Sequence, residues 1–180
     1  MKTTFQTIKD HCPCGEGWKK LIKFHQPKGL NQEVSFAEIL RSNGIKDAVW
    51  ALRVIEDKKK VMLFSADVAE SVLHIFEAQY PDNKELRECI DAIRGFVAGT
   101  VTAVELEEKR YAAAAAADAA AADAAAAAAY ATTTAAAAAA AADAAYATYA
   151  AAADADAAAA AASYAAKWDV ISELFTKHFC

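Results

Sequence analysis

The chain has 180 residues, a formal net charge of −5 and a hydrophobic content of 56%. Alanine inflates that content, because 41 of the 55 residues in the range 112–166 are Ala. The same alanine-rich range holds five Asp and no cation, so the rest of the chain carries equal numbers of basic and acidic residues. A neutral body with an acidic segment argues against a protein that binds nucleic acid through a basic face.

The first ten residues lack the apolar core of a secretion signal. The alanine-rich range is a poor transmembrane candidate, because each charge at the bilayer centre costs roughly 2.5–3.5 kcal/mol and Asp interrupts the range repeatedly. We therefore expect a soluble cytoplasmic protein that does not insert into a membrane. Its four cysteines are then expected to be reduced thiols rather than disulfide partners.

Helical spacing and stop signals predict short helices at the start of the chain. After Pro13, Leu21 and Ile22 lie one helical turn beyond Trp18. The stretch 35–38, "SFAE", is a capping box, in which the serine hydroxyl accepts from the third helical amide and the glutamate reaches back.

The helix that begins there is expected to end at Asn43 and Gly44, which suit a left-handed C-terminal cap. A further helix is predicted in residues 45–56, with Asp47 as its cap, followed by a solvated break at residues 57–60.

Two longer helices are predicted next. Residues 61–80 carry apolar side chains one turn apart and stop at Pro81, and residues 83–99 repeat the pattern and stop at Gly99. No stretch alternates strongly between apolar and polar residues, so the predicted fold class is all-α.

A second capping box, Thr102 to Glu105, begins the alanine-rich part. Alanine has the highest helix propensity, and no breaker occurs before Tyr130, which gives a helix of about 40 Å at 1.5 Å per residue. Beyond it, two arrangements stay open: one rod, or a hairpin with its turn at residues 132–134, where three threonines are able to cap a helix. We favour the hairpin.

The C-terminal stretch returns to ordinary composition. It carries a stripe that we expect to dock the last helix onto the N-terminal helices: Trp168, Ile171, Leu174, Phe175 and Phe179. The predicted organisation is an N-terminal helical body in residues 1–101, with long alanine-rich helices and the docking helix in residues 102–180, forming one cooperative unit.

Tyr and Asp gather on one side of the expected alanine-rich helix. At 100° per residue, a sector of roughly 160° holds six of them: Asp143, Tyr146, Tyr149, Asp154, Asp156 and Tyr164. We call these six residues, with Tyr130, the Tyr/Asp face. Tyr beside Asp suits protein contacts, and equally suits spacers that pack the helix on the body. The opposite Ala side permits close helix packing, within the chain or between copies in a homo-oligomer.

Candidates for chemistry are few. His11, Cys12 and Cys14 are weak zinc candidates, with Cys89, His178 or Cys180 as a further ligand. A single C-x-C without a second pair favours a turn that leads into a helix, so no metal site is predicted. No phosphate-binding glycine loop, nucleophile elbow or HExxH motif occurs, and no cofactor is expected.

Two acids and three tryptophans allow either a structural or a functional interpretation. Asp67 and Glu70 form a carboxylate pair or, as we favour, part of a solvated helix face. Trp18, Trp50 and Trp168 mark a ligand pocket or, as we favour, three core anchors.

The chain resembles a family of small bacterial and phage proteins labelled immunity proteins. The resemblance covers "NGIKDAVWALRVI", the central segment from "FSADVAESVLHIFEAQYPDNKELRECI" to "AGTVTAVELEEKR", the run rich in Ala, Tyr and Asp, and the tail "DVISELFTKHF". It implies neutralisation of a toxin or a defence-system component by binding, and it supplies no catalytic residues.

The expected function is therefore that of a non-enzymatic protein that inhibits a partner protein through the Tyr/Asp face. Two alternatives are a helical protein that sequesters a small ligand or nucleotide between the tryptophan-bearing helices, and a zinc-dependent enzyme built on residues 11–14.

Overall fold

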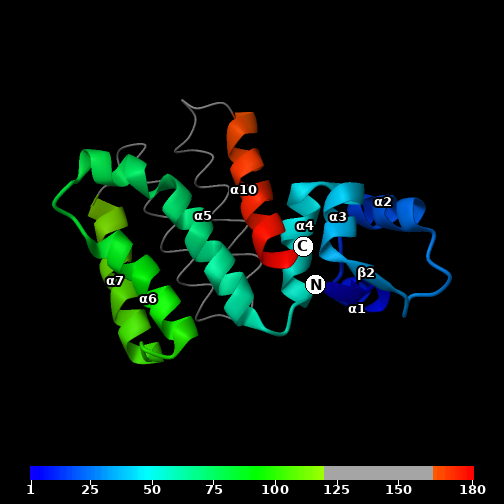
Figure 1. Ribbon diagram of the computed structural model, residues 1–180, viewed down its shortest axis with the longest axis horizontal. Helices are drawn as coiled ribbons and strands as arrows, with labels where there is room; N and C mark the ends of the chain where they lie inside the picture. The colour runs from blue at the N-terminus through cyan, green and yellow to red at the C-terminus, as the bar shows by residue number, and fades with distance from the viewer. Residues whose placement is uncertain (120–163) are drawn as a thin grey trace.

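The computed structural model describes residues 1–119 and 164–180. In this part the chain is almost entirely helical, which confirms the all-α class. Its helices are α1 (Phe5–Asp10), α2 (Gly15–His25), α3 (Phe36–Asn43), α4 (Ile45–Trp50), the 3₁₀ helix η1 (Ala51–Val54), α5 (Lys58–Gln79), α6 (Glu85–Ala98), α7 (Ala103–Ala119) and α10 (Tyr164–Phe179). Figure 1 shows α6 and α7 at one end and α1 to α4 at the other, with α5 and α10 between them.

One small sheet departs from the purely helical expectation. Strand β1 (Lys2–Thr4) pairs antiparallel with β2 (Glu33–Ser35), so that Thr3 lies opposite Val34. Val34 is buried in the core, which explains why this segment is held extended. The pairing joins segments about thirty residues apart, and three-residue strands are too short to show an alternating pattern.

Both predicted capping boxes are present. The Ser35 hydroxyl accepts from the Glu38 amide at 3.2 Å, and the Glu38 carboxylate accepts from the Ser35 amide at 2.8 Å. At the start of α7, the Thr102 hydroxyl accepts from the Glu105 amide at 3.2 Å, and the Glu105 carboxylate accepts from the Thr102 amide at 2.7 Å. Each box satisfies amides that the first helical turn leaves without intrahelical partners.

We expect Ser35→Ala to lower the free energy of unfolding by about 1 kcal/mol, because the α3 cap loses its acceptor. Chemical denaturation measures the change. Ser71→Ala is the matched control: the Ser71 hydroxyl only donates to the Val68 carbonyl within its own helix, at 2.6 Å, so we expect a change within about 0.5 kcal/mol. Equal losses in the two variants would contradict the capping role of Ser35.

Three local predictions were wrong in detail. Asp47 does not cap a helix: Gly44 is the N-cap of α4, without a side-chain hydrogen bond, and the Asp47 carboxylate accepts from the Asn43 side chain instead. The predicted end of α3 at Asn43, with Gly44 as its C-cap, is confirmed, but Gly44 has φ 90° and ψ 174°, a positive φ outside the left-handed helical region. Residues 57–60 are not a break, because Asp57 caps α5 by accepting from the Lys59 amide at 3.1 Å.

Two hydrophobic clusters share α5. One joins a row of α5 residues from Met62 to Phe76 to α6 and α7, and the other joins Val61, Phe64 and Val68 of α5 to α1–α4 and α10. The predicted docking of the last helix is confirmed: Ile171, Phe175 and Phe179 are buried in the second cluster, with Trp168 and Leu174 packed against it. The division into residues 1–101 and 102–180 stays a prediction.

Candidate functional site

The Tyr/Asp face lies almost wholly outside the described residues. Tyr164 is the first residue of α10, and the structure gives no account of its side chain. The other six members, from Tyr130 to Asp156, and the proposed turn at residues 132–134 fall in the range 120–163. The assignment of these residues to a partner-binding surface therefore stays a prediction.

The beginning of the alanine-rich helix is described and shows how it packs. Ala113 is 0% exposed and joins the cluster formed with α5 and α6, together with Leu106 and Ala116. Tyr111 lies on the other side of α7 and is 65% exposed. At this end of the run, Ala113 and Ala116 face the body, whereas Tyr111, Ala112 and Ala115 face outward. The neighbouring helix α6 has mixed composition, so the alanine side does not need a second alanine-rich helix to pack against.

The outer side of α7 carries apolar and cationic groups close together. Val104 lies two turns before Tyr111 and is also largely exposed. The Arg110 guanidinium lies 4.5 Å from the Tyr111 ring centroid and pairs with Glu107. Stacking of a guanidinium on an aromatic ring restrains both side chains.

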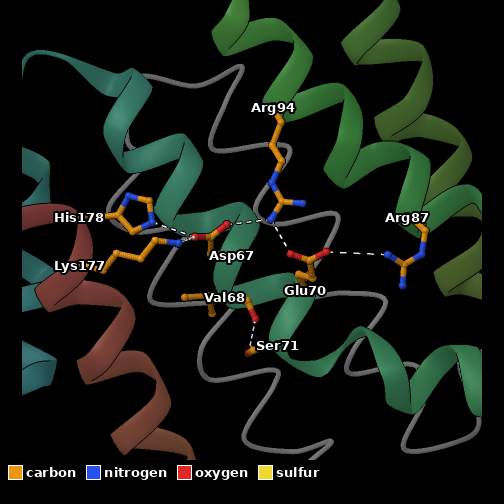
Figure 2. Close-up of polar contacts among 8 residues, drawn as sticks. All are labelled: Asp67, Val68, Glu70, Ser71, Arg87, Arg94, Lys177 and His178. Carbon is orange, nitrogen blue, oxygen red and sulfur yellow. Dashed lines mark hydrogen bonds and ion pairs between the residues drawn. The ribbon is translucent and has the colours of Figure 1, made fainter.

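A charged network centred on Asp67 connects α5, α6 and α10 (Figure 2). Arg94 donates to the Asp67 carboxylate at 2.8 Å from α6. Lys177 and His178 approach the other oxygen of Asp67 from α10, at 3.0 and 2.9 Å. The Asp67 side chain is 15% exposed. The expectation of a solvated face is therefore wrong at Asp67.

The network continues toward the far end of α5. Glu70 accepts from Arg94 at 2.5 Å and lies 3.8 Å from Arg87, which in turn makes a bidentate pair with Glu77 at 2.6 and 2.7 Å (Figure 2 shows all but Glu77). Acids on α5 thus alternate with arginines on α6. This alternating series of ion pairs favours one register of α5 against α6.

Burial alone would raise the pKa of Asp67, but the hydrogen bonds from Arg94, His178 and Lys177 outweigh it and lower the pKa to about 2. The Arg94 pKa is raised in turn, chiefly by its hydrogen bond to Glu70. A carboxylate held ionised by hydrogen bonds from Arg94, Lys177 and His178 is poorly suited to proton transfer near neutral pH. The network therefore acts as a structural clamp on α10.

The described fold, the packing of α7 and this network lie mainly in the part of the chain that matches a known family. The family model described as "Imm-5 like putative immunity protein" matches residues 52–172, about two-thirds of the chain. The chain belongs to the Imm-5 like family. No curated protein and no solved structure matches it.

The Imm-5 like match includes Asp67, Glu70 and Arg94, and it ends before Lys177 and His178. It also includes the range 120–163, with most of the Tyr/Asp face. Among the described helices, none is long and apolar enough to cross a membrane.

The weak zinc candidates lie before the Imm-5 like match and have other partners. His11 approaches the Thr7 carbonyl through Nδ1 at 2.9 Å, and the Cys14 sulfur caps α2 by accepting from the Gly17 amide at 3.3 Å. Cys12 is exposed and Cys89 is buried in the core. Burial raises the pKa of the Cys89 thiol to about 12. Within residues 1–119 and 164–180, no three acidic, histidine or cysteine side chains form a group able to hold a metal ion.

Trp18 and Trp50, also before the Imm-5 like match, line one small apolar pocket of about 60 Å³. Trp168 is not among its lining residues and packs on the same core cluster from α10. Both readings of the tryptophans thus have support: each packs against the core, and two of them line a cavity.

Proposed function

We propose that the chain neutralises a partner protein, a toxin or a defence-system component, by binding to it and covering the surface through which it acts. The observation that carries this proposal is the Imm-5 like family match over residues 52–172. The description of that family indicates an immunity-type role, and the identity of the partner and the mechanism are our inference.

The alanine-rich part supplies the binding surface in this proposal. At its start, Ala113 is buried against the body while Tyr111 is exposed. In this proposal, the Tyr/Asp face is the side of the run that meets the partner. Tyrosine adds a large contact area at low conformational cost. Asp143, Asp154 and Asp156 favour a partner that presents a basic patch, because complementary charge speeds encounter and fixes register.

We further propose that the chain is not an enzyme and acts in the cytoplasm. Support for the first point comes from the described polar clusters. The Asp67 network is fully ion-paired, and the Cys14 thiol is used as a helix cap. These groups stabilise the fold.

Tyr146→Ala/Tyr149→Ala/Asp154→Ala is expected to abolish complex formation without unfolding the chain. Tagged wild-type chain from a bacterial host is used to recover and identify the co-eluting partner, and the triple variant is then compared with it. Circular dichroism checks that helix content is kept. If the triple variant retains the partner as well as wild type does, the Tyr/Asp face is not the binding surface.

A small-ligand function has one specific observation in its favour, the pocket between Trp18 and Trp50. Its volume of about 60 Å³ is far below the roughly 300–1,000 Å³ of typical ligand sites. Sequestration of a nucleotide in this pocket is therefore disfavoured. Mass spectrometry of the intact purified protein under native conditions would detect a retained ligand.

A further inference from the structure

The charge of the chain is unevenly distributed. Residues 1–51 carry eight Lys and Arg against five Asp and Glu, a formal net charge of +3, whereas residues 52–180 carry −8. The basic part includes α1–α4 and precedes the range that the family model matches. It therefore offers a surface of opposite sign to the one proposed for the Tyr/Asp face.

A row of lysines on α2 concentrates this positive charge. Lys19, Lys20 and Lys23 line one groove together with residues of the α2 start and Asp47. Lys19 pairs with Glu16 at 3.1 Å, but both side chains are strongly exposed, so the pair is worth little. Lys23 is exposed and makes no ion pair with any residue in the described part of the chain.

This groove adjoins the pocket between Trp18 and Trp50. The two share Cys14, Gly17 and Asp47 in their linings, so the lysine row and the apolar pocket are parts of one continuous surface. The pocket lining is otherwise apolar: Ile8, Pro13, Leu21, Ile39 and Ala51 accompany the two indoles, with Asn43 as the one further polar residue.

The polar rim of the pocket is fixed in place. Asn43 donates both to the Asp47 carboxylate at 2.8 Å and to the Gly17 carbonyl at 2.9 Å, which links α3 to α4 and α2. The Arg53 guanidinium stacks 4.3 Å above the Trp50 ring and restrains it. A preformed apolar pocket with restrained tryptophans has the features of a protein-binding hot spot.

We propose that this surface, the α2 lysine row with the Trp18/Trp50 pocket, docks an acidic protein segment that inserts one apolar side chain into the pocket. A cavity of about 60 Å³ accepts the end of one apolar side chain. Carboxylates flanking that side chain would lie against Lys19, Lys20 and Lys23. This site differs from the Tyr/Asp face in sequence, charge and ligand, and it goes beyond the proposed neutralisation.

A protein segment fits this surface better than a nucleic acid. Glu16 stands among the lysines, and Asp47 is shared by the groove and the pocket. A continuous run of phosphates would place negative charge against both acids, whereas a peptide can place its carboxylates at the lysines and its apolar side chain beside Asp47. The two indoles line a concave pocket instead of an open platform on which successive bases stack.

The probe is a library of random twelve-residue peptides, selected on the immobilised full-length chain. We expect enriched acidic peptides that contain an apolar residue, and replacement of that residue by Ser should weaken binding at least tenfold. Lys19→Glu/Lys23→Glu should also weaken binding of these peptides at least tenfold in fluorescence anisotropy, because complementary charge becomes repulsive. Both residues are exposed, so this variant is expected to fold.

Lys59→Glu/Lys60→Glu is the matched control, since it changes the net charge equally at exposed positions of α5; its peptide affinity should stay within twofold of wild type. The proposal is overturned if no acidic peptide is enriched, or if both double variants weaken binding equally. It is also overturned if a twelve-nucleotide oligothymidylate binds the wild type more tightly than the peptides and displaces them.

Discussion

Phe175→Ala is expected to lower the free energy of unfolding by about 3–5 kcal/mol, the usual cost of removing a large core side chain. Phe175 is 0% exposed. Its ring centroid lies 6.0 Å from that of Phe64 on α5, 6.3 Å from that of Phe36 on α3 and 5.1 Å from that of Phe179. The substitution opens a cavity where three helices meet.

Urea denaturation followed by circular dichroism measures this loss. Phe24→Ala is the matched control, because Phe24 is 53% exposed on α2 and should cost less than about 1 kcal/mol. If Phe175→Ala cost no more than Phe24→Ala, α10 would not be docked as described.

Asp67→Asn is expected to lower the free energy of unfolding by about 2–3 kcal/mol. The amide keeps the shape of the side chain but removes the negative charge to which Arg94, Lys177 and His178 are bound. It leaves the Arg94 guanidinium, which is 33% exposed, without full compensation. Asp91→Asn, at an exposed position of α6, is the matched control and should change stability by less than about 0.5 kcal/mol.

The same carboxylate predicts a pH dependence. The Asp67 pKa falls from an ordinary 3.8 to about 2 in the folded chain. Its contribution is therefore fully present above about pH 4 and is lost as the pH falls toward 2, by about 2 kcal/mol in total. Comparison of wild type with Asp67→Asn across this range isolates the effect, since the variant lacks the titrating group. Parallel stability curves for the two proteins would contradict the assignment.

Features encoded within a few residues were predictable from the sequence. The capping boxes at Ser35 and Thr102 need only a hydroxyl and a carboxylate three positions apart, and both form as expected. The buried stripe of Ile171, Phe175 and Phe179 was likewise visible from helical spacing. The two partners of each capping box lie three residues apart, and the stripe on α10 follows from the spacing of apolar residues within one helix.

Features that join distant parts of the chain were missed. Asp67 meets Arg94 27 positions away and His178 111 positions away, and nothing around Asp67 in the sequence indicates such partners. The pairing of β1 with β2 also depends on how the helices pack. A pocket at the tryptophans was considered from the sequence, but which two of them share it was not. Asp57 directly precedes Lys58, the first residue of α5, and aspartate is a common helix cap. The three lysines that follow it led us to expect a solvated break instead.

We propose above that the chain neutralises its partner by binding to it. The most direct test adds the purified chain in increasing amounts to the partner identified by co-elution and follows the activity of that partner. We predict complete loss of activity with an end point at a fixed molar ratio, and no loss with Tyr146→Ala/Tyr149→Ala/Asp154→Ala. A partner that remains fully active inside a stable complex would contradict the account.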